Sequence, residues 1–192
     1  MTRYVMVIDQ RRCIGCHSCT VACRTWNKLP LDIVYNPVVT EGAQGTWPNV
    51  HKTWTPTLCM HCENPPCVPC CPSGASQQDD DGTVWVDPKK CLSCKVCVNA
   101  CPYGMRDASK LEDRMHRFVR KCTFCRDKRQ LDPSAQPYCV LTCHQKARIF
   151  GDLDDPNSEV SKLIGSVKTE RLFEEFGTEP QIYYIPDLGG KA

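Results

Sequence analysis

The sequence predicts an α+β fold of two nested units, with few regular elements and long loops. Three observations carry this prediction. The 192 residues include 17 cysteines, and about a third of the chain is apolar once the cysteines are set aside. The chain also has 15 prolines and 11 glycines, which interrupt regular elements. Finally, the cysteines are gathered into groups. Because the apolar core is thin, we expect a group bound by sulfur to complete it.

Sixteen cysteines form four groups with short, repeated spacings. Groups one and three share the spacing C-x2-C-x2-C-x3-C, and group two is C-x2-C-x4-C-x3-C. Group four consists of a C-x2-C pair and a C-x3-C pair, with thirteen residues between them. The members in chain order are Cys13, Cys16, Cys19 and Cys23; Cys59, Cys62, Cys67 and Cys71; Cys91, Cys94, Cys97 and Cys101; and Cys122, Cys125, Cys139 and Cys143, with Cys70 left over.

Three kinds of bonding compete for this pattern. A disulfide framework fits poorly, because neighbours in such a run are badly placed to bridge each other and the total is odd. Zinc takes four thiolates, but its sites usually combine two separated C-x2-C pairs. Group three, followed by Pro102, has the C-x2-C-x2-C-x3-C-P run of bacterial two-cluster ferredoxins. In that run three thiolates bind one cluster and the fourth cysteine binds its neighbour. The pattern therefore favours four [4Fe–4S] clusters.

The spacing between groups predicts how they pair. Only 19 residues separate Cys71 from Cys91, which suits the hairpin between two ferredoxin half-motifs, whereas 35 separate Cys23 from Cys59. Groups two and three are therefore expected to form one bacterial-ferredoxin-like two-cluster unit, nested inside a second unit built from groups one and four. The predicted boundaries are 1–57 plus 102–150 for the outer unit, 58–101 for the inserted unit, and 151–192 for a C-terminal arm that packs on the scaffold or on a partner.

Exchange of the fourth cysteine within each unit predicts the ligands of every cluster. In the inserted unit the two sets are Cys59, Cys62, Cys67 with Cys101, and Cys91, Cys94, Cys97 with Cys71. In the outer unit they are Cys13, Cys16, Cys19 with Cys143, and Cys122, Cys125, Cys139 with Cys23.

The regular elements follow the cysteine groups. Alternating strands at Tyr4–Ile8 and Thr83–Val86 each end just before a cysteine run, which indicates a repeated strand–loop–helix unit. Short helices are expected at Ser18–Trp26 and Ser93–Ala100. The stretch Pro30–Pro56, rich in Pro, Gly, Asn and Thr, is expected to be a long loop or a hairpin excursion.

The chain after group four is expected to add a capped helix and a final strand. Asp155-Pro156-Asn157 precedes a helix predicted at Ser158–Gly165, with Pro156 at its first position. Gln181–Ile185 is a candidate closing strand. The region after Gly151 has no cysteine, which indicates scaffold or partner contact.

Several functions are excluded by composition. The net charge of +2 is too small to indicate nucleic acid. No apolar run approaches the roughly 20 residues of a membrane helix, so direct membrane insertion is not expected. The N-terminal residues show no charged n-region followed by an apolar h-region, so no export signal is expected in them. We also find no Ser/His/Asp constellation, phosphate loop or paired-carboxylate site, and therefore expect no catalysis by this chain alone.

Three segments resemble one known family: Cys59-Met60-His61-Cys62-Glu63-Asn64-Pro65-Pro66-Cys67-Val68-Pro69, Lys121-Cys122-Thr123-Phe124-Cys125, and Phe150-Gly151-Asp152-Leu153-Asp154-Asp155-Pro156. Together with the order of the four groups, they resemble the iron–sulfur electron-transfer subunits of dimethyl sulfoxide reductase-type molybdenum enzymes. The polysulfide, thiosulfate and respiratory arsenate reductase subunits look most similar.

The resemblance implies a place in a complex. Such a subunit relays electrons between a large catalytic subunit, which holds a molybdopterin guanine dinucleotide cofactor, and often a quinone-reactive membrane anchor. It has no substrate pocket. The family commonly works on the extracytoplasmic side of the membrane after export with its partner, and a cytoplasmic complex is the alternative. A free-standing polyferredoxin and a zinc-bound interaction module remain the competing functions.

Two positions depart from the family pattern. His144 follows the last cysteine of group four, where proline is common, which puts the local turn in question. Cys70 precedes Cys71 where an apolar residue is usual, and it is expected to be a small buried hydrophobe.

His17, His61 and His144 lie beside ligand cysteines and are expected either to donate to sulfur or to fill space. The basic run Arg114–Lys121 is expected to be a solvated face or a partner contact.

Overall fold

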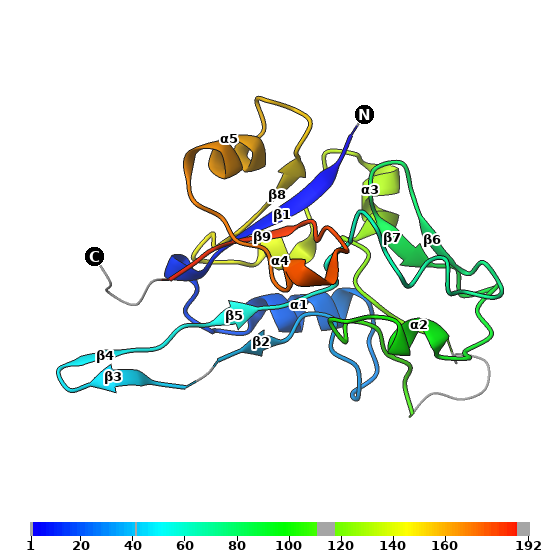
Figure 1. The fold of residues 1–192 in the computed structure, drawn as a ribbon, viewed down its shortest axis with the longest axis horizontal. Coiled ribbons are helices and arrows are strands. Elements are labelled where there is room, and N and C mark those ends of the chain that lie inside the picture. Colours follow the sequence, from blue (N-terminus) through cyan, green and yellow to red (C-terminus); the bar gives the residue numbers. More distant parts are fainter. Residues whose placement is uncertain (1, 41, 111–117, 188–192) are drawn as a thin grey trace.

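The computed structural model describes residues 2–40, 42–110 and 118–187 of the chain. Within them, a central sheet has the strand order β8–β1–β9 (Figure 1). β1 pairs antiparallel with β8 and parallel with β9, so this sheet joins the beginning of the chain to its end. The bounds are Tyr4–Asp9 for β1, Arg148–Asp152 for β8 and Ile182–Ile185 for β9.

β1 is buried on both faces, because alternate side chains enter different cores. Val5 and Val7 pack in one core together with Val160 of α5, the helix Glu159–Ser166. Met6 and Ile8 point to the opposite core, which also contains Cys19, Cys62 and Cys139 from three different cysteine groups. The sheet therefore separates a small apolar layer under α5 from the cysteine-bearing layer.

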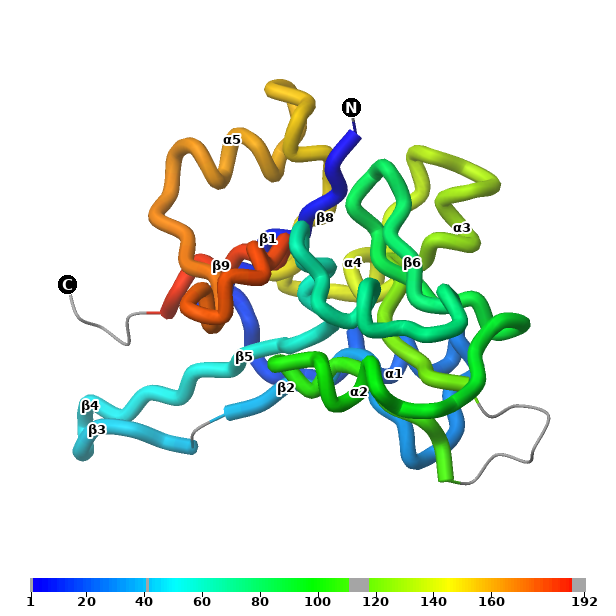
Figure 2. Tube along the Cα trace, turned by 45° about the vertical axis from the view of Figure 1, so that its right-hand side comes forward, coloured from blue at the N-terminus to red at the C-terminus, as the bar shows by residue number. Residues whose placement is uncertain are grey.

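The cysteine-bearing layer is made of short elements and long connections. α1 lies beside α4 although more than a hundred residues separate them (Figure 2). Between the two helices, Trp26 stacks on Tyr138 with ring centroids 4.1 Å apart. A small β6–β7 hairpin belongs to the same layer. The bounds are η1 Gln10–Arg12, α1 Ser18–Trp26, β6 Ser76–Gln78, β7 Val84–Val86, α2 Val96–Asn99, α3 Arg126–Leu131, α4 Tyr138–Leu141 and η3 Glu174–Phe176.

The later part of the stretch Pro30–Pro56, from β2 to β5, forms an extended arm that projects from the body (Figure 1). The pair β2–β5 lies at its base and the hairpin β3–β4 at its end. Trp47 is 89% exposed in the turn of that hairpin. The prediction of a hairpin excursion is confirmed. The bounds are β2 Val38–Val39, β3 Gln44–Thr46, β4 Asn49–His51 and β5 Thr55–Pro56.

Two predicted helices need correction. The helix expected at Ser93–Ala100 shrinks to Val96–Asn99, because Ser93 and Lys95 have φ values of +55° and +62° and therefore cannot be helical. The helix expected at Ser158–Gly165 is α5, and Ser158 is its N-cap, accepting a hydrogen bond from the Ser161 amide at 3.2 Å. Pro156 thus lies before the cap, and its predicted place at the first helical position is wrong.

Within the described residues, no helix is both long and apolar enough to cross a membrane. Of the basic run, residues 114–117 lie outside the described residues.

Candidate iron–sulfur centres

The first C-x2-C pair of each group is bent by one residue in the left-handed region of backbone space. The residue before the second cysteine has a positive φ in all four groups, between +45° and +66°. This sharp local turn brings the second cysteine back toward the first. The four residues are Gly15, His61, Ser93 and Phe124. The four groups therefore share one loop geometry, as the repeated spacing suggested.

A second repeated turn follows the last cysteine of three groups. Gly74, Gly104 and Lys146 each have a positive φ and donate a backbone hydrogen bond to the cysteine three residues earlier, at 3.2, 3.2 and 2.9 Å. In group four Lys146 takes the place of the glycine, and His144 that of the proline. The turn after Cys143 therefore forms although His144 stands where proline is common.

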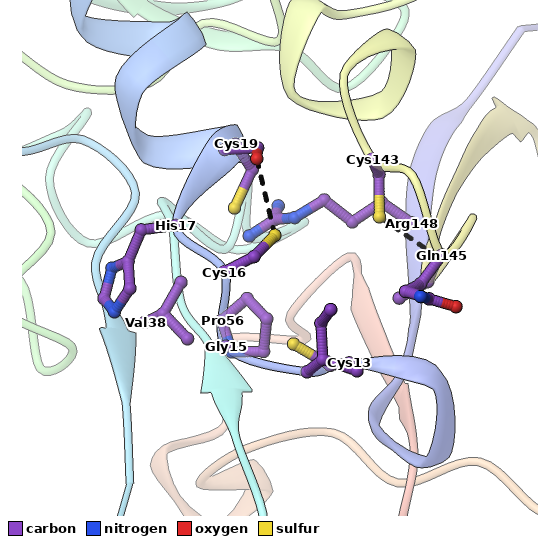
Figure 3. A pocket seen from close by; sticks show the side chains of 13 residues that line it. Cys13, Gly15, Cys16, His17, Cys19, Val38, Pro56, Cys143, Gln145 and Arg148 are labelled. Carbon is purple, nitrogen blue, oxygen red and sulfur yellow. Dashed lines mark hydrogen bonds between the residues drawn. The ribbon is translucent and has the colours of Figure 1, made fainter.

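The sulfur-bearing residues Cys13, Cys16, Cys19 and Cys143 line a single cavity (Figure 3). Cys13 and Cys16 come from the loop before α1, Cys19 comes from the start of α1, and Cys143 comes from the turn before β8. The cavity wall is otherwise largely apolar and includes Val38, Pro56 and Ala147. The Ala147 amide donates to Cys143 Sγ at 3.2 Å. Four cysteines from groups one and four thus meet in one place.

A second cavity is lined by cysteines from groups two and three. Cys91 and Cys94 come from the loop that leads into α2, Cys97 comes from α2 itself, and Cys71 comes from the turn before β6. The Ser76 amide donates to Cys71 Sγ at 3.4 Å. This arrangement is the counterpart of the first cavity in the other half of the molecule.

The remaining cysteines of group two lie beside the last cysteine of group three. Burial, and then the neighbouring sulfurs of Cys59, Cys67 and Cys101, raise the pKa of Cys62 to about 12. Burial likewise raises the pKa of Cys67 to about 11, and Cys59 and Cys101 add to the effect. These four residues are thus close enough to interact electrostatically.

Group four is assembled around a cysteine of group one. Burial, then the neighbouring Cys139 and Cys125, raise the pKa of Cys23 to about 12. Burial, then Cys23 and Cys139, raise the pKa of Cys122 well above its usual range. The Phe124 amide donates to Cys122 Sγ at 3.4 Å. The structure therefore brings together the residues of all four predicted ligand sets, and their role as ligands stays a prediction.

Comparison with known protein families identifies the chemistry of these cysteines. A 4Fe-4S dicluster domain model matches residues 50–153, and a 4Fe-4S binding domain model matches residues 4–25. A selenate reductase subunit of Mesobacillus selenatarsenatis is 40% identical, over 95% of this chain and 72% of that protein. A sulfite dehydrogenase subunit of Allochromatium vinosum is 40% identical, over 97% of this chain and 84% of that protein. The arsenate respiratory reductase iron–sulfur subunit of a Shewanella species is 35% identical, over 99% of both chains.

The chain belongs to the iron–sulfur electron-transfer subunits of dimethyl sulfoxide reductase-type molybdoenzymes. The resemblance seen in the sequence is thereby confirmed, and the bound group is the [4Fe–4S] cluster, in more than one copy.

The cysteines present fit such clusters. Within the described residues, no three Cys, His, Asp or Glu side chains converge closely enough to hold a single metal ion. Instead, two of the sets of four cysteines line cavities whose walls are apolar side chains and which receive amides aimed at sulfur. Amide donors of this kind stabilise thiolates, and they are one of the means by which iron–sulfur subunits set cluster potentials.

The histidines expected beside the clusters have different roles. His61 is fully buried, stacks on Phe124 with ring centroids 3.7 Å apart, and accepts a hydrogen bond from the Val84 amide through Nδ1 at 3.1 Å. Burial, then the charges of Lys121, Arg129 and Arg106, hold the pKa of His61 well below its usual range. The ring is therefore neutral and fills space between groups two and four. His17 and His144 are exposed.

Two features of the iron–sulfur subunit could not be predicted from the spacing of the cysteines. Arg148 and Arg106 are buried near the cysteines, and neither belongs to a motif that a single sequence reveals. Cys70, expected to be buried, is only partly so, and it packs against the core formed by Cys67, Val84 and Cys97.

Gly15 makes the first cluster loop sensitive to one methyl group. Its φ is +66°, and an added Cβ would lie 2.3 Å from Trp54 Cδ2. We expect Gly15→Ala to displace the loop and to remove the cluster bound there, which is about four irons per chain. The matched control is Gly74→Ala, because Gly74 has a φ of +62° but no atom within 4 Å of the added Cβ.

That control incurs only the backbone cost of about 1–2 kcal/mol and should keep its iron. Iron analysis of the two purified variants checks the prediction. Equal iron in Gly15→Ala and the unaltered subunit would show that Trp54 moves aside.

Proposed function

We propose that this chain is the four-cluster electron-transfer subunit of a molybdenum oxidoreductase. It carries electrons between a molybdopterin catalytic subunit and a quinone-reactive membrane subunit or another redox partner. Each [4Fe–4S] cluster, when bound, supplies a one-electron carrier whose potential depends on burial, charge and hydrogen bonds to sulfur. The chain itself binds the clusters and does not act on a substrate.

The observation that carries the proposal is the meeting of four cysteines at each of four places. Sixteen of the 17 cysteines lie at these places, and each place combines three cysteines of one group with the last cysteine of another, which is the proximity that the predicted ligand exchange requires. Four cysteines per cluster then give four clusters. His61 of group two stacks on Phe124 of group four, and this contact keeps the cysteine sets of the two groups close together.

Exposure supports an order for the clusters along the relay. The loops of groups one and three reach the surface, where Cys16 and Cys94 are exposed. The same two loops also carry exposed apolar side chains: Ile14 is 58% exposed and Leu92 is 70% exposed. Cys59, Cys62, Cys125 and Cys139 of the other groups are buried. The sets of groups one and three are therefore the two ends of the relay, and those of groups two and four form its middle.

Partners and location extend the proposal. The relatives named above are subunits of selenate reductase, arsenate respiratory reductase and sulfite dehydrogenase. By analogy, a large catalytic subunit docks at one end of this relay, and a membrane anchor or another carrier docks at the other. We propose the extracytoplasmic side of the membrane as the site of the complex, reached by export together with a partner.

The test is elemental analysis of the native complex, purified anaerobically through a tag on this chain. We expect about sixteen irons per chain from the four clusters. Additional iron and about one molybdenum are expected if the catalytic subunit is retained, since that subunit would hold the molybdenum cofactor.

Each other outcome has a meaning. Sixteen irons without molybdenum, in a complex shown by mass spectrometry to contain no large chain, would favour a free polyferredoxin. Clearly fewer irons would contradict the four-cluster count. Zinc in place of iron would contradict electron transfer altogether.

A further inference from the structure

Two arginines are buried in the cysteine layer, one in each half of the molecule. Arg148 and Arg106 are each 3% exposed. Arg148 begins β8 and pairs in register with Ile8 of the central strand. Arg106 follows the turn after the last cysteine of group three. Their equivalent positions, five residues after Cys143 and Cys101, repeat like the cluster loops themselves.

Arg148 lies between the two cysteine sets of the outer unit. It lines the cavity of Cys13, Cys16, Cys19 and Cys143, and its guanidinium end reaches in among their side chains (Figure 3). Cys139, from the other set of the unit, is also among the sulfurs that act on it. Its hydrogen bonds are to neutral atoms, Met6 Sδ at 3.5 Å and Asn36 Oδ1.

Arg106 has the same relation to the inserted unit. Its Nη2 donates to Ser76 Oγ at 2.7 Å, while Nε and Nη1 have no hydrogen-bond partner among the described residues. Burial alone would lower the pKa of Arg106, but the neighbouring sulfurs of Cys67, Cys59 and Cys97 outweigh it, so the pKa is raised. Cys67 and Cys59 belong to one predicted ligand set, and Cys97 to the other.

A buried guanidinium needs a negative partner, because an uncompensated buried charge is costly. Arg129 shows the ordinary solution in this fold: it is 6% exposed and forms a salt bridge with Asp81 at 3.2 Å. By contrast, the hydrogen bonds that Arg148 and Arg106 form within the described residues reach no carboxylate. A cubane with four thiolate ligands carries net negative charge, and it supplies the partner that the protein does not.

We propose that Arg148 and Arg106 set the potentials of the clusters in pairs, each raising the reduction potential of both clusters in its own unit. This inference rests on the four-cluster function proposed above. Reduction adds an electron to an already negative cluster, and a fixed positive charge between two clusters favours that step at both. The same attraction offsets the repulsion between two neighbouring reduced clusters, so adjacent positions of the relay can hold electrons together.

The test is a redox titration of the full complex, monitored by electron paramagnetic resonance. Neutral variants Arg148→Gln and Arg106→Gln are compared with the charge-retaining variants Arg148→Lys and Arg106→Lys. We expect each glutamine variant to disfavour reduction of two clusters at least tenfold, a shift of about 59 mV to lower potential for one electron. The other two clusters should keep their potentials, so each arginine serves as the control for the other.

The outcomes separate this inference from the function on which it rests. Four clusters whose potentials are unchanged in both glutamine variants, or shifted equally at all four, would overturn it. If a glutamine variant loses iron, the lysine variant at the same position decides between the two explanations. A lysine variant that retains its iron and has near-normal cluster potentials supports the role of charge. A lysine variant that loses the same clusters contradicts it. Fewer than four clusters in the unaltered complex would instead refute the proposed function.

Discussion

Replacing Cys23 with alanine is expected to eliminate the signal of one [4Fe–4S] cluster, and that cluster is the one bound by group four. Cys23 belongs to group one in the sequence, but burial and the sulfurs of Cys139 and Cys125 act on it in the fold. We therefore expect the ligand exchange of two-cluster ferredoxins to operate here between segments about a hundred residues apart in the chain. Counting the cluster signals by electron paramagnetic resonance in the reduced complex measures the loss.

Double variants make the assignment decisive. Adding Cys125→Ala to Cys23→Ala should remove no further cluster, because both residues bind the same one. Adding Cys19→Ala instead should remove a second cluster. Cys70→Ala is the matched control, since Cys70 lies outside the sets, and it should keep all four signals. The nested arrangement is wrong if Cys23→Ala and Cys19→Ala together cost the same single cluster as either alone.

Removing iron with a chelator under reducing conditions is expected to abolish cooperative unfolding of the chain. The apolar core is thin, and several of its buried positions are cysteines such as Cys19, Cys62 and Cys139. Without clusters, Arg148 and Arg106 lose their negative partners, at a cost of about 3–5 kcal/mol each. A typical domain is stable by only roughly 5–15 kcal/mol. Cluster binding and folding should therefore be one process.

Circular dichroism and calorimetry of the chelated and reloaded protein measure this effect. The reloaded chain should unfold in one sharp transition, and the chelated chain should show none. A parallel sample treated with the same reductant but no chelator separates loss of iron from chemical damage. A colourless chain that still unfolds cooperatively would show that the polypeptide core suffices.

Local elements could be predicted because they depend on neighbouring residues. α1 begins and ends where the sequence placed it, at Ser18–Trp26, and the strands β1, β7 and β9 lie within one residue of their predicted bounds. The shortened helix at Val96–Asn99 marks the limit. There the cysteine loop has positive φ at Ser93 and Lys95, and this backbone conformation prevents the helix from starting as early as its residue pattern predicts.

The central sheet could not be predicted from local pattern. β8 carries Arg148, a charged residue that gives no strand signal, and it forms because it pairs with β1 across about 140 residues. The parallel pairing of β1 with β9 likewise depends on where the rest of the chain brings the last strand. Such pairings depend on burial and hydrogen bonding that only the assembled core provides.

The kind of centre and the number of available thiolates could be predicted from cysteine spacing, because the spacing within a loop limits which sulfurs can share a cluster. Spacing also predicted that Cys143 joins group one and that Cys23 joins group four, and the fold places them there. The burial of Arg148 and Arg106 among the sulfurs appears only in the folded chain. The physical reason is that electrostatic interaction depends on distance in space and on burial, and neither is a property of spacing along the chain.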